Sequence, residues 1–435
     1  MSVPPRLALR GDLLDFTQDP GLDVRQPAGV RFRADHWLLV EGGRIVGVQA
    51  QDPGEGWQRV DHRGRLVLPG FIDTHVHSAQ IDVIGAWGTQ LLDWLSTHTF
   101  PAEQRMADPA HAAVISELFV ESLLAHGTTT ACVFPTVHAV SVDTLFAAAQ
   151  SRGMRLIAGK VLMDRHAPPA LCDDPQDVPG VERVVAAQIE RWHGQDRLAY
   201  ALTPRFAPTS TDAQLAMAGR LLARAPGLYL QTHVAENVDE VRWVRELFPQ
   251  ARSYLDVYAR HGLLTERAIF AHGIWLDDAD RAALAQAGAQ VAFCPSSNLF
   301  LGSGAFDWPA AQAAGVGVSL ASDVGGGTSL SMRRTMLDAY KVQAGAGRRV
   351  TAFTLLHAAT RGAARALRLS DEIGQLEPGA AADVCVWNWA TAPLAQRRQA
   401  VARDLHERLF AWLTVADERD LVETRIAGVV QPFRR

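Results

Sequence analysis

Histidine and aspartate residues stand at the ends of several apolar, strand-like runs in this sequence. The first such run ends in Pro69-Gly-Phe-Ile-Asp-Thr-His75-Val-His77, with two histidines two positions apart. Residues two apart in a strand point to the same face, so both imidazoles face one side of the chain. Two converging imidazoles suit Zn²⁺ or Fe²⁺, whereas the alternative is a polar loop that simply contains two histidines.

The same arrangement recurs at later strand ends. Leu228–His233 and Ala268–His272 are apolar runs that end in His, and Val316–Asp323 ends in a carboxylate. A single strand-terminal His is readily explained as a satisfied polar residue. Four strands of one predicted barrel that end in His or Asp indicate a shared site, because barrel enzymes place catalytic groups at the C-terminal ends of their strands.

Eight strand-like runs, each followed by an amphipathic helical pattern or separated from the next run by one, fill the middle of the chain. The helix that begins after Asp108 has Pro109 in its first turn and Gly127 at its end, as helix termini prefer. This alternation predicts an α/β fold, a (β/α)8 TIM barrel. The expected strands are Leu66–His77, Thr128–Val133, Arg155–Met163, Leu198–Thr203, Leu228–His233, Ala268–His272, Ala289–Cys294 and Val316–Asp323.

The two ends of the chain do not follow this rhythm. Residues 37–49 resemble a β-hairpin around Gly42-Gly43, and residues 382–387 form another strand-like run. Neither segment alone is long enough for a stable sheet. We therefore expect a small β-sandwich built from residues 1–68 and 374–435, interrupted by a catalytic barrel over residues 69–373.

Composition excludes several classes of protein. The 435 residues are 48% hydrophobic and 20% charged, and 42 Lys and Arg against 47 Asp and Glu give a formal net charge of -5. No basic surplus is available for nucleic acid. The four cysteines are far apart, which predicts no disulfide framework. The first residues lack the apolar core of a signal peptide, and no run approaches about 18 apolar residues, so a cytoplasmic protein without membrane spans is expected.

Several segments carry a resemblance to a known family. They include the opening Pro69–His77, the segments Trp94–Glu103 and Thr203–Phe206, the stretch His233–Asn237 and the closing Gly374–Val384. Over essentially its whole length the chain resembles the metal-dependent amidohydrolases, and within them the members that deaminate guanine. The resemblance implies hydrolysis of guanine to xanthine and ammonia in purine catabolism or salvage, one zinc ion per chain with Fe²⁺ as the other possibility, and a homodimer.

The resemblance also implies a set of site residues. The implied zinc ligands are His75, His77, His233 and Asp323. The implied substrate contacts are Gln80, Arg205, Phe206, Glu236, and the two metal ligands His233 and Asp323. Two departures from the family pattern, Ala235 in place of Ser and Gly325 in place of Ala, put only the detail of the pocket in doubt.

The chemistry of these residue types fits hydrolysis. Three neutral imidazoles and one carboxylate leave a bound metal with net positive charge and an open position, where the pKa of a water falls to about 7. Asp323 can take the proton of that water, and His272 can hold the attacking oxygen. Glu236, three residues beyond His233, can shuttle a proton to the ring and the leaving nitrogen. The alternative for Glu236 is a solvated acid at the start of the next helix, where acids are favoured.

Three side chains suit a purine ring. Arg205 offers a planar fork of donors for a carbonyl, Gln80 can donate and accept, and Phe206 can cover a flat face. The alternatives are surface pairing for Arg205, rim hydrogen bonding for Gln80 and core packing for Phe206. Their shared position at the predicted mouth of the barrel favours binding.

The sequence also predicts the number of metal ions. Binuclear members of the resembled family usually bridge two metals through a carboxylated lysine on the fourth strand, but Leu198–Phe206 contains no lysine. Lys160 lies on the strand before it and is expected to form a salt bridge or to line the pocket wall. One metal ion is expected.

Two other functions keep the same fold. A related zinc aminohydrolase could act on another purine, an oxidised guanine, a pterin or a triazine-like ring. A non-catalytic barrel scaffold is the second alternative, but such relatives typically lose metal ligands, and here the set is complete. The H-x-E and P-C-x-x-C signature of the other zinc deaminase fold is absent from the sequence.

Overall fold

Parallel strands with helices between them build the central part of the chain in the computed structural model, which describes residues 6–87 and 91–434. The chain divides into two compact units. One consists of residues 74–120 and 131–329, and the other combines residues 1–73, 121–130 and 330–435.

The barrel sheet runs in the order β5-β6-β7-β9-β10-β11-β12-β13, with the short β8 paired to β9. Backbone hydrogen bonds also connect the first strand, β5, to the segment that follows the last strand, β13. The Asp323 amide donates to the His75 carbonyl at 2.9 Å, and the His77 amide donates to the Val324 carbonyl at 2.9 Å. The strands are β5 (Phe71–His77), β6 (Thr128–Phe134), β7 (Arg155–Ala158), β8 (Val161–Leu162), β9 (Leu198–Pro204), β10 (Tyr229–Val234), β11 (Ala268–His272), β12 (Gln290–Phe293) and β13 (Gly317–Leu320).

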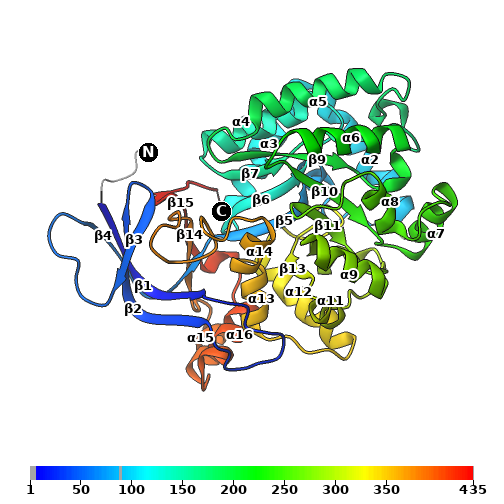
Figure 1. The fold of residues 1–435 in the computed structure, drawn as a ribbon. Coiled ribbons are helices and arrows are strands. Elements are labelled where there is room, and N and C mark those ends of the chain that lie inside the picture. The colour runs from blue at the N-terminus through cyan, green and yellow to red at the C-terminus, as the bar shows by residue number, and fades with distance from the viewer. Residues whose placement is uncertain (1–5, 88–90, 435) are drawn as a thin grey trace. The chain divides into compact units, whose positions relative to one another are not determined.

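Helices follow the strands, and α4, α5 and α6 lie together outside β7 and β9 (Figure 1). The helices up to residue 329 are α1 (Leu91–Trp94), α2 (Phe100–Gln104), α3 (Pro109–Leu124), α4 (Ala139–Ser151), α5 (Val178–Trp192), α6 (Asp212–Arg224), α7 (Val238–Leu247), α8 (Tyr254–Arg260), α9 (Asp278–Ala287), α10 (Pro295–Phe300) and α11 (Trp308–Ala313). The later helices are α12 (Met332–Gly345), α13 (Ala352–Ala358), α14 (Arg361–Ala366), α15 (Pro393–Ala400) and α16 (Leu405–Val415).

Local sequence explains where these helices begin and end. Asn237 starts α7 with a capping box in which its side chain and that of Glu240 each bind a backbone amide of the other end of the turn. The Asp277 side chain accepts from the Asp280 amide at the start of α9, and Gly288 ends that helix with φ 69°. The predicted helix start at Asp108 is confirmed, since its carboxylate accepts from the His111 amide at 2.9 Å.

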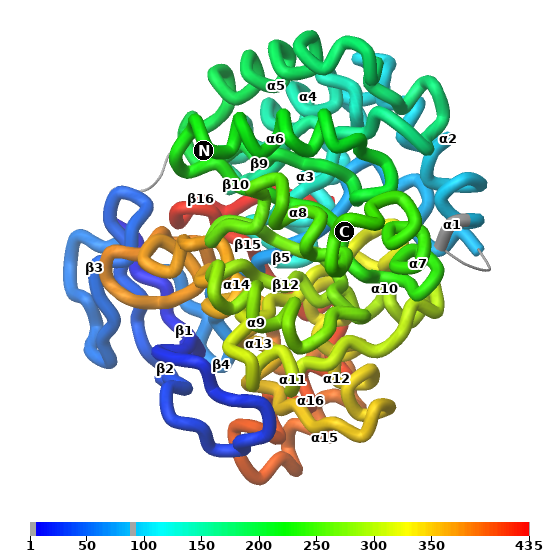
Figure 2. The backbone as a smooth tube through the Cα atoms, turned by 45° about the vertical axis from the view of Figure 1, so that its right-hand side comes forward, coloured from blue at the N-terminus to red at the C-terminus, as the bar shows by residue number. Residues whose placement is uncertain are grey.

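Strands from both ends of the chain form one mixed sheet of seven strands, in the order β16-β15-β14-β4-β1-β2-β3. The predicted hairpin turns at Gly42-Gly43, where φ is 58° and 80°. The blue N-terminal strands and the orange C-terminal segment lie side by side in Figure 2, and the Ile45 amide donates to the Ala380 carbonyl at 2.9 Å. The strands are β1 (Arg6–Phe16), β2 (Val30–Glu41), β3 (Arg44–Gln49), β4 (Gln58–Pro69), β14 (Val384–Asn388), β15 (Leu421–Ile426) and β16 (Val429–Val430).

The predicted barrel and the shared terminal β structure are confirmed. Several strands differ from their predicted bounds. The predicted strand Leu66–His77 is divided between β4 and β5, and the predicted strand Arg155–Met163 is divided between β7 and β8. The strand β13 stops at Leu320, so Asp323 stands in the loop three residues beyond it, with φ 50°. Among the described residues, no helix combines the length and the hydropathy that crossing a membrane requires.

Candidate active site

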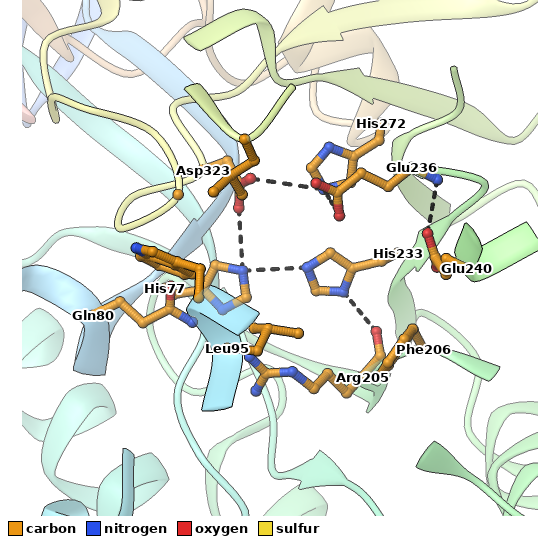
Figure 3. Close-up of a pocket in the computed structure, with 13 residues that line it drawn as sticks. His77, Gln80, Leu95, Arg205, Phe206, His233, Glu236, Glu240, His272 and Asp323 are labelled. Atoms are coloured by element: carbon orange, nitrogen blue, oxygen red, sulfur yellow. Dashed lines mark hydrogen bonds and ion pairs between the residues drawn. The ribbon is translucent and has the colours of Figure 1, made fainter. Parts of the chain in front are cut away.

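The side chains of the predicted metal set converge on one pocket, where His77, His233 and Asp323 point toward one another (Figure 3). His75, His77 and Asp323 are buried, and His233 is partly buried. Nε2 of His77 lies 3.2 Å from Nε2 of His75 and 3.3 Å from Nε2 of His233. Oδ1 of Asp323 lies 3.1 Å from Nε2 of His75 and 3.2 Å from Nε2 of His77. The fold thus brings together residues that lie as far apart as positions 75 and 323.

His272 also belongs to this group. One ligand atom each from His75, His233, His272 and Asp323 lie within 4.8 Å of one another, a spacing suited to a metal ion. Nε2 of His272 is 3.7 Å from Oδ2 of Asp323 and 3.4 Å from Oε2 of Glu236. This set of four contains His272, predicted as a catalytic residue, and does not contain the predicted ligand His77, although Nε2 of His77 lies within 3.3 Å of Nε2 of His233.

The donor chemistry of this group fits a divalent cation. Nitrogen and oxygen ligands at about 2.0–2.2 Å from a metal are about 3.0–3.5 Å from one another, as the atoms of His75, His77 and Asp323 are here. Burial lowers the pKa of His75 to about 4 and lowers the pKa of His233 well below its usual range. Neutral imidazoles are the form that binds metal.

Backbone geometry helps to aim three of the side chains. Ala235, His272 and Asp323 have φ of 48°, 70° and 50°, in the left-handed region that residues other than glycine rarely adopt. Such conformations cost about 1–3 kcal/mol each and are concentrated at functional sites. His272 is the last residue of β11, Ala235 follows β10, and Asp323 lies three residues after β13, so the three strained positions are all at or just beyond the end of a strand.

Glu236 is buried beside this group and shares contacts with His272. Its Oε1 accepts from the Ser303 hydroxyl at 3.1 Å, and Nδ1 of His272 lies 2.9 Å from Oδ1 of Asn298. Because Oδ1 of Asn298 can only accept, Nδ1 carries the proton and Nε2 faces Glu236. Burial raises the pKa of Glu236 to about 7, so that carboxyl group occurs in both protonation states near neutral pH.

The electrostatics of His272 oppose those of the other histidines. Burial alone would lower its pKa, but the nearby carboxylates of Glu236 and Asp323 raise the pKa of His272 well above its usual range. For Asp323, burial acts to raise the pKa, and hydrogen bonds from His75 and His77 hold the pKa well below its usual range. The site therefore separates its titratable groups into neutral imidazoles, one ionised carboxylate and a coupled Glu–His pair.

Gln80 and Arg205 lie on the other side of the same pocket, which His77, His233, Glu236 and Asp323 also line. Both are bound to Glu103, a fully buried residue of α2. Phe206 lines the pocket next to Arg205, and its ring packs edge-on to Trp243 with centroids 6.2 Å apart. The predicted substrate contacts are thus all brought to one cavity.

Some residues of the site escaped the sequence analysis. Glu103 stood in a family-matching segment but was given no role, and Asn298 and Ser303 were not considered as partners of His272 and Glu236. For Glu103 the only sequence signal was its place in the segment Trp94–Glu103. Asn298 ends another family-like stretch, Cys294–Asn298, and Ser303 lies in none of these segments. Trp94, Leu95 and Leu301 also line the pocket. The first two belong to the quoted segment Trp94–Glu103, and Leu301 gave no signal beyond hydrophobicity.

Lys160 is explained by a salt bridge, as expected. Its Nζ lies 2.6 Å from Oδ1 of Asp173 and donates to the Val161 carbonyl at 3.3 Å. The side chain is buried and does not line the pocket that contains His77 and Asp323.

Comparison with known proteins agrees with this geometry. Residues 66–430 match the model of the Amidohydrolase family. The chain is 42% identical over 426 residues to the guanine deaminase of Escherichia coli (strain K12), which covers 97% of this chain and 96% of the relative.

Solved structures show the same relationship. A structure described as E. coli guanine deaminase has a TM-score of 0.93 at 40% identity and covers 99% of this chain and 100% of that one. A guanine deaminase from Bradyrhizobium japonicum has a TM-score of 0.92 at 31% identity, with 99% and 100% covered. The chain belongs to the amidohydrolase family and, within it, groups with the guanine deaminases.

Proposed function

We propose that this protein hydrolyses guanine to xanthine and ammonia, acting on a C–N bond of a cyclic amidine. One observation supports the proposal above the others: a single cavity is lined both by metal-binding residue types and by groups suited to a purine ring. These residues are His77, His233, His272, Asp323, Glu236, Gln80, Arg205 and Phe206. The relatives that match nearly the whole chain are named guanine deaminases. In the reaction, the bond from C2 to the amino nitrogen breaks and a bond from C2 to a water oxygen forms.

We propose one zinc ion, with Fe²⁺ as the second candidate, held by His75, His77, His233 and Asp323. When bound, the cation supplies Lewis-acid activation of water at neutral pH. Because His272 lies close to His75, His233 and Asp323, it is the alternative to His77 as the third imidazole ligand. We assign His272 instead to orienting the attacking oxygen, because its Nε2 lies close to Glu236 and its Nδ1 is held by Asn298.

Glu236 is the proton carrier in this proposal. Oε2 accepts one proton from the attacking water and gives it to the ring nitrogen next to C2. When the C2–N bond breaks, Glu236 carries the second proton from the new C2 hydroxyl to the departing amine, so that ammonia leaves neutral and C2 becomes a carbonyl. A pKa of about 7 suits a group that must both accept and donate at neutral pH. From the sequence alone, Asp323 is expected to take the proton of the water. We assign that proton to Glu236 instead, because the pKa of Asp323 is held well below its usual range, and Asp323 then stays ionised and accepts a hydrogen bond from the same water.

Recognition of the ring falls to the other side of the pocket. Arg205 donates to the carbonyl at C6, Gln80 pairs with the amide edge of the ring, and Phe206 covers a face. His233 and Asp323 border the same space and complete the contacts around the reacting carbon.

A guanine-to-xanthine absorbance assay combined with elemental analysis tests the proposal. We expect rapid xanthine formation from guanine and about one zinc or iron per chain. Ammonia release from a pterin or a triazine-like ring, at a kcat/KM above that for guanine, would replace the substrate and keep the mechanism. A metal-free protein without aminohydrolase activity would favour the scaffold alternative.

Assembly, location and domain limits complete the proposal. We propose a cytoplasmic homodimer whose catalytic barrel comprises residues 69–373. None of the four cysteines forms a disulfide among the described residues, as expected for a reducing compartment. Light scattering of the purified protein, fractionation of cells that express it, and limited proteolysis test these three points.

A further inference from the structure

The two residues assigned to ring recognition are bound to the same buried carboxylate. Oε1 of Glu103 accepts from Nε2 of Gln80 at 2.9 Å and from Nη1 of Arg205 at 2.9 Å, and Oε2 accepts from the same Nη1 at 2.7 Å. Glu103 is 0% exposed, and it comes from α2 rather than from a strand of the barrel. It is therefore placed behind the pocket wall and acts on the pocket through its partners.

Glu103 fixes the orientation of the Gln80 amide. A carboxylate can only accept hydrogen bonds, so the nitrogen of the amide must face Glu103. The amide oxygen of Gln80 then accepts from the Gly325 amide at 3.1 Å. With both ends of the amide held, one N–H and one lone pair of Gln80 have fixed directions for a ligand, and the reversed amide would oppose donor to donor at Gly325.

Glu103 also determines what Arg205 can offer. The guanidinium uses Nη1 for Glu103, and its central carbon lies 5.5 Å from the ring centroid of Phe100, the first residue of α2. Glu103 thus pairs with the charge of the guanidinium, and Phe100, one helical turn earlier, packs beside the plane of the group. Nε and Nη2 are then the nitrogens left to bind a ring carbonyl, and the buried positive charge is balanced before any ligand enters.

We infer that Glu103 is a specificity-determining positioning residue, which sets the pattern of donors and acceptors that Gln80 and Arg205 present to the purine ring. The inference rests on the proposed function for the identity of the ring. Glu103 itself lies outside the residues that line the pocket, so its effect on the ligand is transmitted by the two residues it binds.

The test compares wild type with Glu103→Gln. The amide has no charge and places an NH₂ group against donors of Arg205 or Gln80, so the hydrogen-bond pattern of the wall changes while its volume does not. We expect KM for guanine to rise about 10- to 100-fold, because buried polar groups lose their partners, with kcat within about threefold and metal content unchanged. The preference for guanine over adenine should fall as well.

Asp173→Asn is the matched control. Asp173 is also a carboxylate bound to a buried cation, Lys160, but it lies outside the pocket. Asp173→Asn should lower the melting temperature of the protein and leave the KM for guanine and the preference for guanine over adenine as in wild type. If Glu103→Gln behaves in the same way as this control, Glu103 has only a structural role and the inference is overturned.

A double-mutant comparison provides a second readout. If Glu103 acts through Gln80, the combined change Glu103→Gln with Gln80→Ala should lower kcat/KM less than the product of the single effects, whereas independent effects would multiply. If the two single effects on kcat/KM multiply in the double variant, Glu103 does not act through Gln80, and that part of the inference is overturned.

Glu103→Asp covers the case in which Glu103→Gln does not fold. The shorter acid keeps the charge, so it should raise KM in the same direction by a smaller factor, and an unchanged KM would overturn the inference. A wild-type protein that does not deaminate guanine would instead refute the proposed function. The same variants would then be compared by the equilibrium binding of xanthine, where a wild-type affinity in Glu103→Asp counts against the inference.

Discussion

The hydroxyl of Ser303 donates to Oε1 of Glu236 at 3.1 Å, while Oε2 of the same carboxyl group lies 3.4 Å from Nε2 of His272. One oxygen is thus held by a neutral donor, and the other faces the metal-binding group. A carboxyl group fixed in this way presents a defined atom for proton transfer. The arrangement is the basis of the first prediction.

Glu236→Gln should retain metal and bind guanine but lose about 10²–10⁴-fold in kcat, because an amide cannot carry the proton. Steady-state rates at saturating guanine measure this loss. Glu246→Gln, an exposed acid on α7, is the control and should behave as wild type. A kcat near that of wild type in Glu236→Gln would return Glu236 to the alternative of an acid at a helix start.

Asn298→Ala should lower activity by about 10- to 100-fold, the range for partners that orient functional histidines. Without the acceptor at Nδ1, the ring of His272 loses the hydrogen bond that fixes its orientation, and Nε2 no longer has a defined position beside Glu236 and Asp323. Asn298→Asp keeps an acceptor and should retain more activity than Asn298→Ala. Equal activity of both variants with wild type would show that the orientation of His272 is set elsewhere.

Elemental analysis should find about one zinc or iron per chain, and His75→Ala or His233→Ala should lose it, since each change removes one donor from a closely spaced group. Chelation should abolish activity, and addition of Zn²⁺ should restore it. His98→Ala is the control, because Nε2 of His98 bonds to the Trp87 carbonyl at 2.9 Å and His98 does not line the pocket. Two metal ions per chain would refute the mononuclear assignment.

Adenine should be a very poor substrate. Its amine at C6 would place a donor against Arg205, and sites built around such hydrogen bonds discriminate by about 10⁴–10⁵. Arg205→Ala should therefore lose more kcat/KM on guanine than Gln80→Ala, since it also leaves the buried Glu103 without its counter-charge. Comparable kcat/KM on the two bases, or no loss in Arg205→Ala, would refute this model of the pocket.

Stability should fall below pH 6.5 because of His357, a buried residue of α13 whose ring packs edge-on to Phe16 at 5.4 Å. Burial, with help from the charges of Arg365 and Arg361, lowers the pKa of His357 to about 4. The unfolded chain, with a His pKa near 6.5, therefore binds more protons between about pH 4 and pH 6.5, and the free energy of unfolding decreases as the pH falls through that window.

The expected loss from His357 between pH 8 and pH 5 is about 2 kcal/mol. Urea unfolding of wild type and His357→Leu at both pH values measures it. The variant removes the titrating group, so its stability should depend less on pH by that amount. The same pH dependence in both proteins would show that other groups cause it.

The sequence alone predicted helix starts and, to within one residue, the ends of the strands that close with His77, His233 and His272, because those signals are local. Asn237 and Asp277 cap helices through backbone amides two or three residues away, and a His at the end of an apolar run is visible without its neighbours. The barrel followed from the repeated alternation, and parallel strands then required His233 and His272 to meet at one end.

Only the tertiary structure decided which side chains share contacts. Glu103 meets Arg205 across 102 positions of the chain, and Gly325 meets Gln80 across 245, so neither pair has a periodicity or spacing that a sequence pattern could reveal. The barrel strand β13 ends at Leu320, so Asp323 lies in a loop. The hydrogen bond from the Asp323 amide to the His75 carbonyl holds that loop, and a local sequence pattern does not reveal it. Residue types and their spacing therefore indicate the chemistry of the site. The hydrogen-bond partners of those residues depend on which distant segments meet when the whole barrel closes.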